Sequence, residues 1–301
     1  MPSPTLRRRA AFLGLLAAAA APWPAYALVT PDAPAPTPAT PTPAAALGTM
    51  DQAIESLRLQ AALTHDVTRL VSRTPAADAA WIALARAELT HAGIVLDRPQ
   101  LFVVVDRSPR VQQLAIVLAT PADAPADPWR VIGGTRVSTG SVGRFDHYIT
   151  PRGVFHVTPA ILGFRAEGTL NENGIRGLGA RGMRVWDFGW QVAAKGWKPD
   201  PGKPDRTPIR LMMHATDPDK LEQRIGQPAS QGCIRIPTTM NRFLDHHGVL
   251  DAEYERAATT ELRFRALLPP GREPSPLAGN TLVVVDSADH GSVNMASRSI
   301  P

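Results

Sequence analysis

Short apolar runs rich in β-branched residues recur along the last two thirds of this 301-residue chain. Glycine, proline and asparagine separate them, which is typical of strands joined by turns and loops. The runs cover residues 101–105, 113–118, 129–132, 136–138, 154–157, 184–190, 209–213 and 281–285. This pattern predicts one mainly β domain over residues 97–290, with long loops and few helices.

Helical spacing is found mainly before that region. Apolar residues between 49 and 73 recur at intervals that suit an amphipathic helix, and Thr74-Pro75 is a start signal for a second helix over 75–91. We therefore expect a short α-helical hairpin over residues 49–96. A further helix is expected over 238–247, whereas residues 253–258 and 261–267 fit no single type.

The first 27 residues have the three parts of an export signal. Residues 7–9 are all arginine, residues 10–21 are apolar, and Ala25-Tyr26-Ala27 has the form of a cleavage site. An apolar helix over 10–21 would be ~18 Å long, too short for a ~30 Å hydrocarbon core. We expect a cleaved signal peptide over 1–27, export to the periplasm, and no stable membrane span.

Two further segments and the net charge narrow the possible partners. Residues 28–48 alternate Pro, Ala and Thr, which favours an extended linker, and residues 291–301 are expected to form a flexible tail. Removal of the three signal arginines takes the formal net charge from +5 to +2 (5 − 3). A charge that small, without a basic patch, gives no reason to expect a nucleic-acid partner.

Cys233 is the only cysteine of the chain. In an oxidising compartment structural cysteines occur in pairs, so an unpaired thiol is either buried and inert or chemically used. The residues alone leave both alternatives open. His214 lies 19 positions upstream, directly after the apolar run 209–213, where the end of a strand would hold its side chain.

A cysteine nucleophile needs a base that takes the thiol proton, and His214 is the candidate. The backbone carbonyl of Ala215 is the local acceptor that can orient the imidazole. In the segment 230–233, a tight turn at Gly232 would direct the N–H groups of Gly232 and Cys233 at an oxyanion.

Two side chains near this pair are candidates for substrate contact. Arg235 lies on the Cys233 side of an extended chain, where it could raise thiolate character, hold a substrate carboxylate or form a structural ion pair. Trp186, Phe188 and Trp190 alternate along one predicted strand. We expect two of these aromatic side chains in the core and one, Trp190, beside a cleft.

Three separated motifs resemble the L,D-transpeptidase catalytic domain of the YkuD type. They are His214, Ser230-Gln231-Gly232-Cys233-Ile234-Arg235, and upstream Thr150-Pro151-Arg152-Gly153-Val154-Phe155. The family pattern is a histidine followed by Ser/Thr-His-Gly-Cys, and the 15 residues found here between His214 and Ser230 suit its spacing. The resemblance covers roughly residues 97–250. It implies a β-sandwich-type fold of curved sheets with the cysteine in a cleft.

The resemblance also implies an activity. Cys233 would attack a carbonyl of a peptidoglycan stem peptide, His214 would protonate the leaving amine, and an amine of a second stem would resolve the thioester into a cross-link. Water in the last step would make the chain a carboxypeptidase that trims stem peptides. No metal or organic cofactor is implied, and carbapenems acylate this cysteine in the family. A non-catalytic peptidoglycan-binding module with an inert cysteine is the alternative from a different class.

One position departs from the family pattern. Gln231 stands where the family usually has His, and glutamine cannot titrate. Ser230 and Gln231 are expected to contact substrate, so the change leaves open whether 3-3 cross-links form or the 1-3 links of a divergent proteobacterial branch. No metal site is expected, because no second cysteine is available and the adjacent His246 and His247 would point ~100° apart on a helix.

Overall fold

The computed structural model describes residues 47–122, 129–199 and 201–288. The expected signal peptide, nearly all of the linker and the C-terminal tail lie outside these ranges. Within them the chain is mixed α/β, because five α-helices and nine strands contribute about equally. The prediction of a β-rich fold with few helices is therefore confirmed only in part.

The helices occupy both ends of the described chain. They are α1 (Thr49–Asp66), α2 (Pro75–His91), α3 (Thr238–His246), α4 (Ala252–Ala258) and α5 (Leu262–Leu267), with a short 3-10 helix η1 at Glu222–Arg224. Thr74 caps α2 as expected, since its hydroxyl accepts the Ala77 N–H at 3.2 Å. The two segments that the sequence left untyped are α4 and α5.

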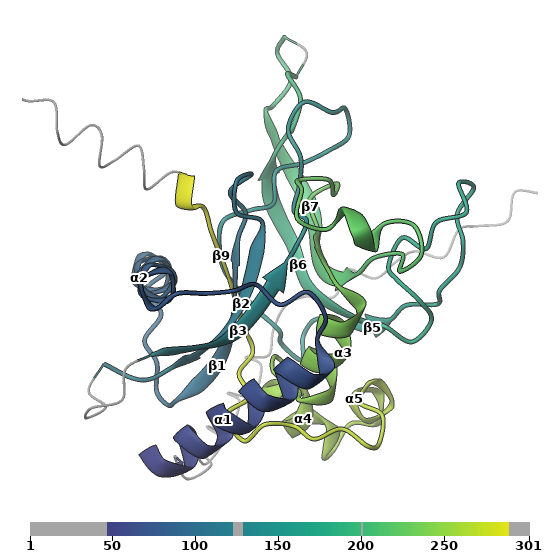
Figure 1. Cartoon of the computed structure of the whole chain (residues 1–301). Coiled ribbons are helices and arrows are strands. Elements are labelled where there is room, and N and C mark those ends of the chain that lie inside the picture. Colours follow the sequence, from purple (N-terminus) through teal and green to yellow (C-terminus); the bar gives the residue numbers. More distant parts are fainter. Residues whose placement is uncertain (1–46, 123–128, 200, 289–301) are drawn as a thin grey trace, which may run out of the picture. The chain divides into compact units, whose positions relative to one another are not determined.

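The strands form two sheets (Figure 1). The first has the order β3-β2-β1-β9-β4, and the second has the order β5-β6-β7-β8. Their bounds are β1 (Gln100–Asp106), β2 (Gln113–Ala119), β3 (Arg130–Arg136), β4 (Gly153–His156), β5 (Phe164–Arg165), β6 (Arg184–Ala194), β7 (Arg206–Ala215), β8 (Ile234–Ile236) and β9 (Thr281–Val285). The C-terminal strand β9 lies between β1 and β4, parallel to the first and antiparallel to the second.

The first sheet is apolar on both faces, and the two N-terminal helices cover opposite ones. Leu59 and Leu63 of α1 belong to the cluster that contains Leu101, while Trp81 of α2 belongs to the cluster that contains Phe102. Adjacent residues of a strand face opposite ways, so the helices lie on opposite faces. The two helices therefore do not pack against each other as the hairpin expected for residues 49–96. The domain boundaries drawn from the sequence remain predictions.

The main core lies between the two sheets. Trp186, Leu211, Met213 and Ile234 of the second sheet share one buried cluster with strands of the first. Side chains of α3, α4 and α5 close this cluster, chiefly Met240, Phe243, Tyr254 and Phe264. Among the described residues, no helix combines the length and the apolar composition needed to cross a bilayer.

Candidate active site

Strands β7 and β8 place the histidine and the cysteine on the same face of the second sheet. The two strands run parallel, with Met213 opposite Ile234 and His214 opposite Arg235. Met213 and Ile234 belong to the core, so His214 and Arg235 share the other face of this sheet. Cys233 directly precedes Ile234 and continues on that outer face. The pairing of β7 with β8 therefore brings the nucleophile candidate and the base candidate to one face of the second sheet.

His214 is held as a neutral imidazole. Its ring is buried, and Nδ1–H donates to the Ala215 carbonyl at 2.6 Å. A carbonyl can only accept, so Nδ1 carries the proton and Nε2 keeps its lone pair. Burial lowers the pKa of His214 from 6.5 to about 4, and the charge of Arg235 acts in the same direction. The expected role of the Ala215 carbonyl as the orienting acceptor fits this arrangement.

The loop between β5 and β6 explains the burial of His214. Ala166 and Met183 form a small apolar cluster with Val185, the residue directly opposite His214 on β6. Buried Asp217 anchors this cover, because its carboxylate accepts the backbone N–H of Arg176 at 2.8 Å. The sequence predicted a loop here but gave Asp217 no role.

Cys233 rests as a half-buried thiol. Its Sγ lies 3.7 Å from the Arg210 carbonyl, to which the S–H donates. Burial raises the pKa of the Cys233 thiol, although the Met212 backbone N–H and the charge of Arg235 act against that change. The raised pKa favours the neutral thiol of Cys233, and His214 is a neutral imidazole on the same face of the sheet.

The turn before the cysteine is closed by its own hydrogen bonds. Gly232 has a φ of +122°, and a Cβ there would lie 2.6 Å from Ile209 Cδ1, so only glycine fits. The Gly232 N–H donates to Ser230 Oγ at 3.1 Å, and the Ser230 hydroxyl donates to the Cys233 carbonyl at 2.5 Å. The Gly232 N–H is thus directed into the turn instead of at an oxyanion. Ser230 is fully buried, which does not suit its expected contact with substrate.

Thr150 fastens this turn to the rest of the protein. Its buried hydroxyl donates to the Gly232 carbonyl at 2.8 Å and accepts the Gly140 N–H at 2.9 Å. Arg107 in turn donates to the Thr150 carbonyl at 2.6 Å. The Thr-Pro-x-Gly motif was identified from the sequence, but its function as a brace for the Cys233 turn was not.

Arg235 is a half-buried cation beside the thiol. Burial lowers its pKa, and its Nη1 donates weakly to the Ala229 carbonyl at 3.4 Å. Its Nε is buried and has no hydrogen-bond partner. No ion pair found within the described ranges includes Arg235. The structural ion pair that the sequence left open is therefore not found there, and an anionic ligand would satisfy the guanidinium.

Trp190 reaches the same face through a bulge. Trp186 and Phe188 are buried as expected, whereas Trp190 is 67% exposed. The register of β6 against β7 shifts between Asp187 and Trp190, which places Trp190 opposite Arg210. An uninterrupted alternation would have kept Trp190 on the core face.

Gln231 lies on the surface of the Cys233 turn. Its amide Nε2 donates to Asp146 at 3.4 Å, and the Tyr148 hydroxyl donates to the same carboxylate at 3.1 Å. Gln231 is therefore exposed to an incoming ligand and linked to the loop that precedes Thr150.

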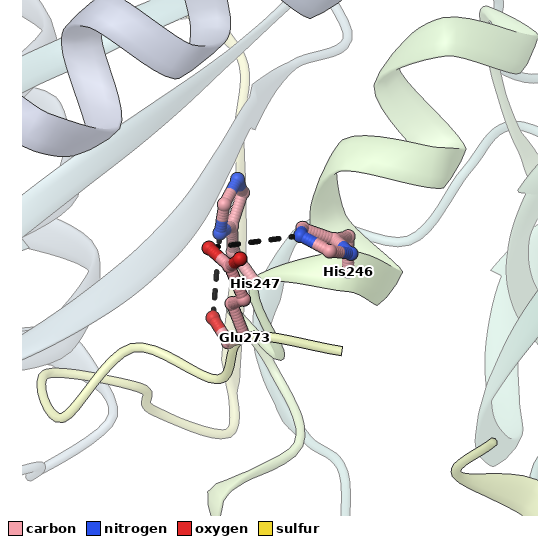
Figure 2. Close-up of side chains that lie close together, drawn as sticks. All are labelled: His246, His247 and Glu273. Carbon is pink, nitrogen blue, oxygen red and sulfur yellow. Dashed lines mark hydrogen bonds and ion pairs between the residues drawn. The ribbon is translucent and has the colours of Figure 1, made fainter. Parts of the chain in front are cut away.

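A group of metal-ligating side chains lies elsewhere, at the end of α3. One ligand atom each from His246, His247 and Glu273 lies within 4.8 Å of the others. Figure 2 shows His246 directed at the Glu273 carboxylate, with Nε2 and Oε2 3.9 Å apart. The helical geometry from which the sequence argued against a shared ion does not apply, because His247 lies past the last helical residue and the ring centroids are only 4.7 Å apart.

A cavity of about 580 Å³ lies beyond β8, away from the thiol. Arg69, Arg136, Glu222 and Pro237 are among its lining residues. Cys233 and His214 do not line it, so this cavity is separate from the candidate active site.

Comparison with known proteins adds little to this geometry. No protein-family model matches the chain, and no curated protein matches it. One solved structure is similar to 71% of this chain at 12% identity and a TM-score of 0.29. It is a fused zinc-dependent amidase/peptidase/peptidoglycan-binding domain-containing protein from Clostridium acetobutylicum, and this chain spans 64% of its length. A similarity that low carries neither fold nor activity across.

Proposed function

We propose that this chain is an exported L,D-transpeptidase of peptidoglycan with Cys233 as its nucleophile. One observation carries the proposal: His214 Nδ1–H is bound to the Ala215 carbonyl at 2.6 Å on the strand beside Cys233. A histidine fixed in that tautomer offers Nε2 as a base on the outer face of the sheet. The motifs of residues 150–155 and 230–235 support the same assignment.

The first half-reaction forms a thioester. His214 Nε2 takes the Cys233 proton as the sulfur attacks a carbonyl carbon of the donor stem peptide. The tetrahedral oxyanion then collapses, the C–N bond breaks, and the leaving amine takes the proton from Nε2. Because the Gly232 N–H is bound to Ser230, we assign oxyanion stabilisation to the Cys233 N–H.

The second half-reaction transfers the acyl group to an amine. The amine of a second stem attacks the thioester, His214 takes its proton, and that proton returns to sulfur as the C–S bond breaks. Arg235 binds a carboxylate of the donor stem, because its guanidinium is half-buried beside the thiol with Nε unpartnered. Trp190 and Gln231, both exposed, contact the acceptor.

A carboxypeptidase that trims stem peptides is the second candidate. It differs only in using water for the second step. Mass spectrometry of muropeptides incubated with the purified chain separates the two, because a transpeptidase produces new dimers. Shortened stems without dimers would overturn the transpeptidase proposal. The mass of the dimers and their fragments would also distinguish 3-3 from 1-3 links.

Two variants test the roles of the pair. Cys233→Ala should abolish the mass adduct that a carbapenem forms with the wild type, whereas a non-catalytic binding module would form no adduct at all. His214→Asn keeps an amide N–H for the Ala215 carbonyl but removes Nε2. We expect this variant to fold and to lose turnover, and wild-type turnover would disprove the assignment of the base.

A further inference from the structure

His246, His247 and Glu273 lie on two segments that the backbone holds together. His246 is the last residue of α3, and Glu273 belongs to the segment between α5 and β9. The Glu273 N–H donates to the His246 carbonyl at 2.8 Å, and the Ser275 N–H donates to the His247 carbonyl at 2.9 Å. The cluster is therefore fixed by main-chain pairing and does not depend on chance contact between surface side chains.

The three side chains offer the donor set of a zinc site. Imidazole nitrogen and carboxylate oxygen are ordinary Zn²⁺ ligands, and two histidines with one glutamate can bind the ion with water in the fourth position. We propose that His246, His247 and Glu273 bind one Zn²⁺ ion. The ligand atoms lie within 4.8 Å of one another, so only small side-chain movements are needed for all three to reach one ion.

His247 presents a weakly bonded ring nitrogen to this cluster. The ring is buried, Nε2 has no partner, and Nδ1 has only a long hydrogen bond of 3.3 Å to the Glu273 carbonyl. Nε2 lies on the side of the ring away from Glu273, so the atom that faces the cluster is Nδ1, and little is lost when it exchanges its long hydrogen bond for a metal ion. In the zinc-bound form Nδ1 binds the ion and the ring proton moves to Nε2.

The neighbouring charges allow an ion to enter. Glu273 pairs with Arg58 at 3.5 Å, but Arg58 has a closer partner in Glu55, at 2.7 and 2.8 Å. Glu273 can therefore turn to the metal without leaving the Arg58 guanidinium unpaired. The Ser275 hydroxyl also donates to Glu55 at 2.6 Å, which keeps α1 attached to the same segment. Bound zinc would join the end of α3, which follows the Cys233 strand, to the segment that leads into β9.

Titration of the metal-free, purified chain with zinc chloride tests the proposal. We expect one bound ion per chain by calorimetry. Co²⁺ in place of zinc should give visible absorption without the near-ultraviolet thiolate band that coordination by Cys233 would produce. A thiolate band, or binding lost in Cys233→Ala, would overturn the proposal by placing the ion at the cysteine.

Two substitutions of surface side chains identify the ligands. Glu273→Gln and His246→Gln should each weaken zinc binding strongly. The loss should exceed the ~10–100-fold that follows when a residue that only hydrogen-bonds to a metal ligand is removed. The matched control is His65→Gln, which removes an exposed histidine paired with Asp66 at 2.6 Å and should leave binding unchanged. Circular dichroism confirms that each variant is folded. Equal zinc affinity in the wild type and both ligand variants would refute the site, whatever the enzymatic activity.

Discussion

Acidification should destabilise the fold through His214 by an amount that the structure sets. The imidazole is buried and its folded-state pKa is about 4, whereas an exposed histidine titrates near 6.5. Between these values the unfolded chain binds a proton that the folded chain does not, so the free energy of unfolding falls as pH falls. The full difference, at ~1.4 kcal/mol per pKa unit, is worth ~3 kcal/mol below pH 4.

The loss is already measurable at mild pH. Between pH 7 and pH 5 the same linkage removes ~2 kcal/mol of stability, an average of ~1 kcal/mol per pH unit against a limiting slope of ~1.4. Urea unfolding followed by tryptophan fluorescence at several pH values measures this loss of stability. The comparison requires that the dependence of the unfolding free energy on urea concentration be the same at each pH.

His214→Asn isolates this contribution from other acid-sensitive groups. Asparagine can still donate to the Ala215 carbonyl but cannot take up a proton, so the variant should lose ~2 kcal/mol less than the wild type between pH 7 and pH 5. Identical pH dependence in the wild type and His214→Asn would refute the conclusion that His214 is buried and neutral.

Four further outcomes follow from the contacts. Thr150→Val leaves the partners of a buried hydroxyl unsatisfied, so unfolding free energy should fall by ~1–3 kcal/mol and carbapenem acylation should slow. Trp190→Ala should change stability by less than ~0.5 kcal/mol yet raise KM, whereas Trp186→Ala should cost ~3–5 kcal/mol in a denaturant titration. Gln231→His should keep acylation and change only the cross-link distribution seen by mass spectrometry. The rate at which iodoacetamide alkylates Cys233 should keep rising with pH above the range in which ordinary thiols ionise, because burial raises the pKa of the Cys233 thiol.

Local patterns predicted the strands and the position of the histidine well. The runs 101–105, 113–118 and 281–285 are strands, and the run at 209–213 belongs to β7, whose last two residues are His214 and Ala215. These predictions rest on side-chain alternation and turn residues, which are encoded within a few positions. The same local reasoning also located the one cysteine turn that the sequence contains.

The features that local sequence patterns did not predict depend on pairing between distant segments. Nothing local indicates that β9 inserts between β1 and β4, or that α1 and α2 take opposite faces of one sheet. The bulge that turns Trp190 outward interrupts an alternation that reads as regular. His247 and Glu273 are 26 positions apart and meet only because their backbone segments pair. Each of these features depends on contacts between distant segments, for which residue spacing gives no signal.

The candidate active site is built where the two sheets meet, and this explains why its parts are so far apart in the chain. Ser138 pairs with Arg235, and Gly140 pairs with Ser230, so the segment after β3 runs beside the Cys233 turn. Thr150 then bonds to both sides of this seam. The turn that aims Cys233 is therefore complete only once both sheets have docked. The half-buried thiol with its raised pKa lies at this seam, whereas His214, on the outer face of the second sheet, is kept from water by the loop between β5 and β6. The position of the Cys233 turn is thus a property of the assembled seam, and a substitution that loosens the seam should impair the proposed nucleophile without touching it.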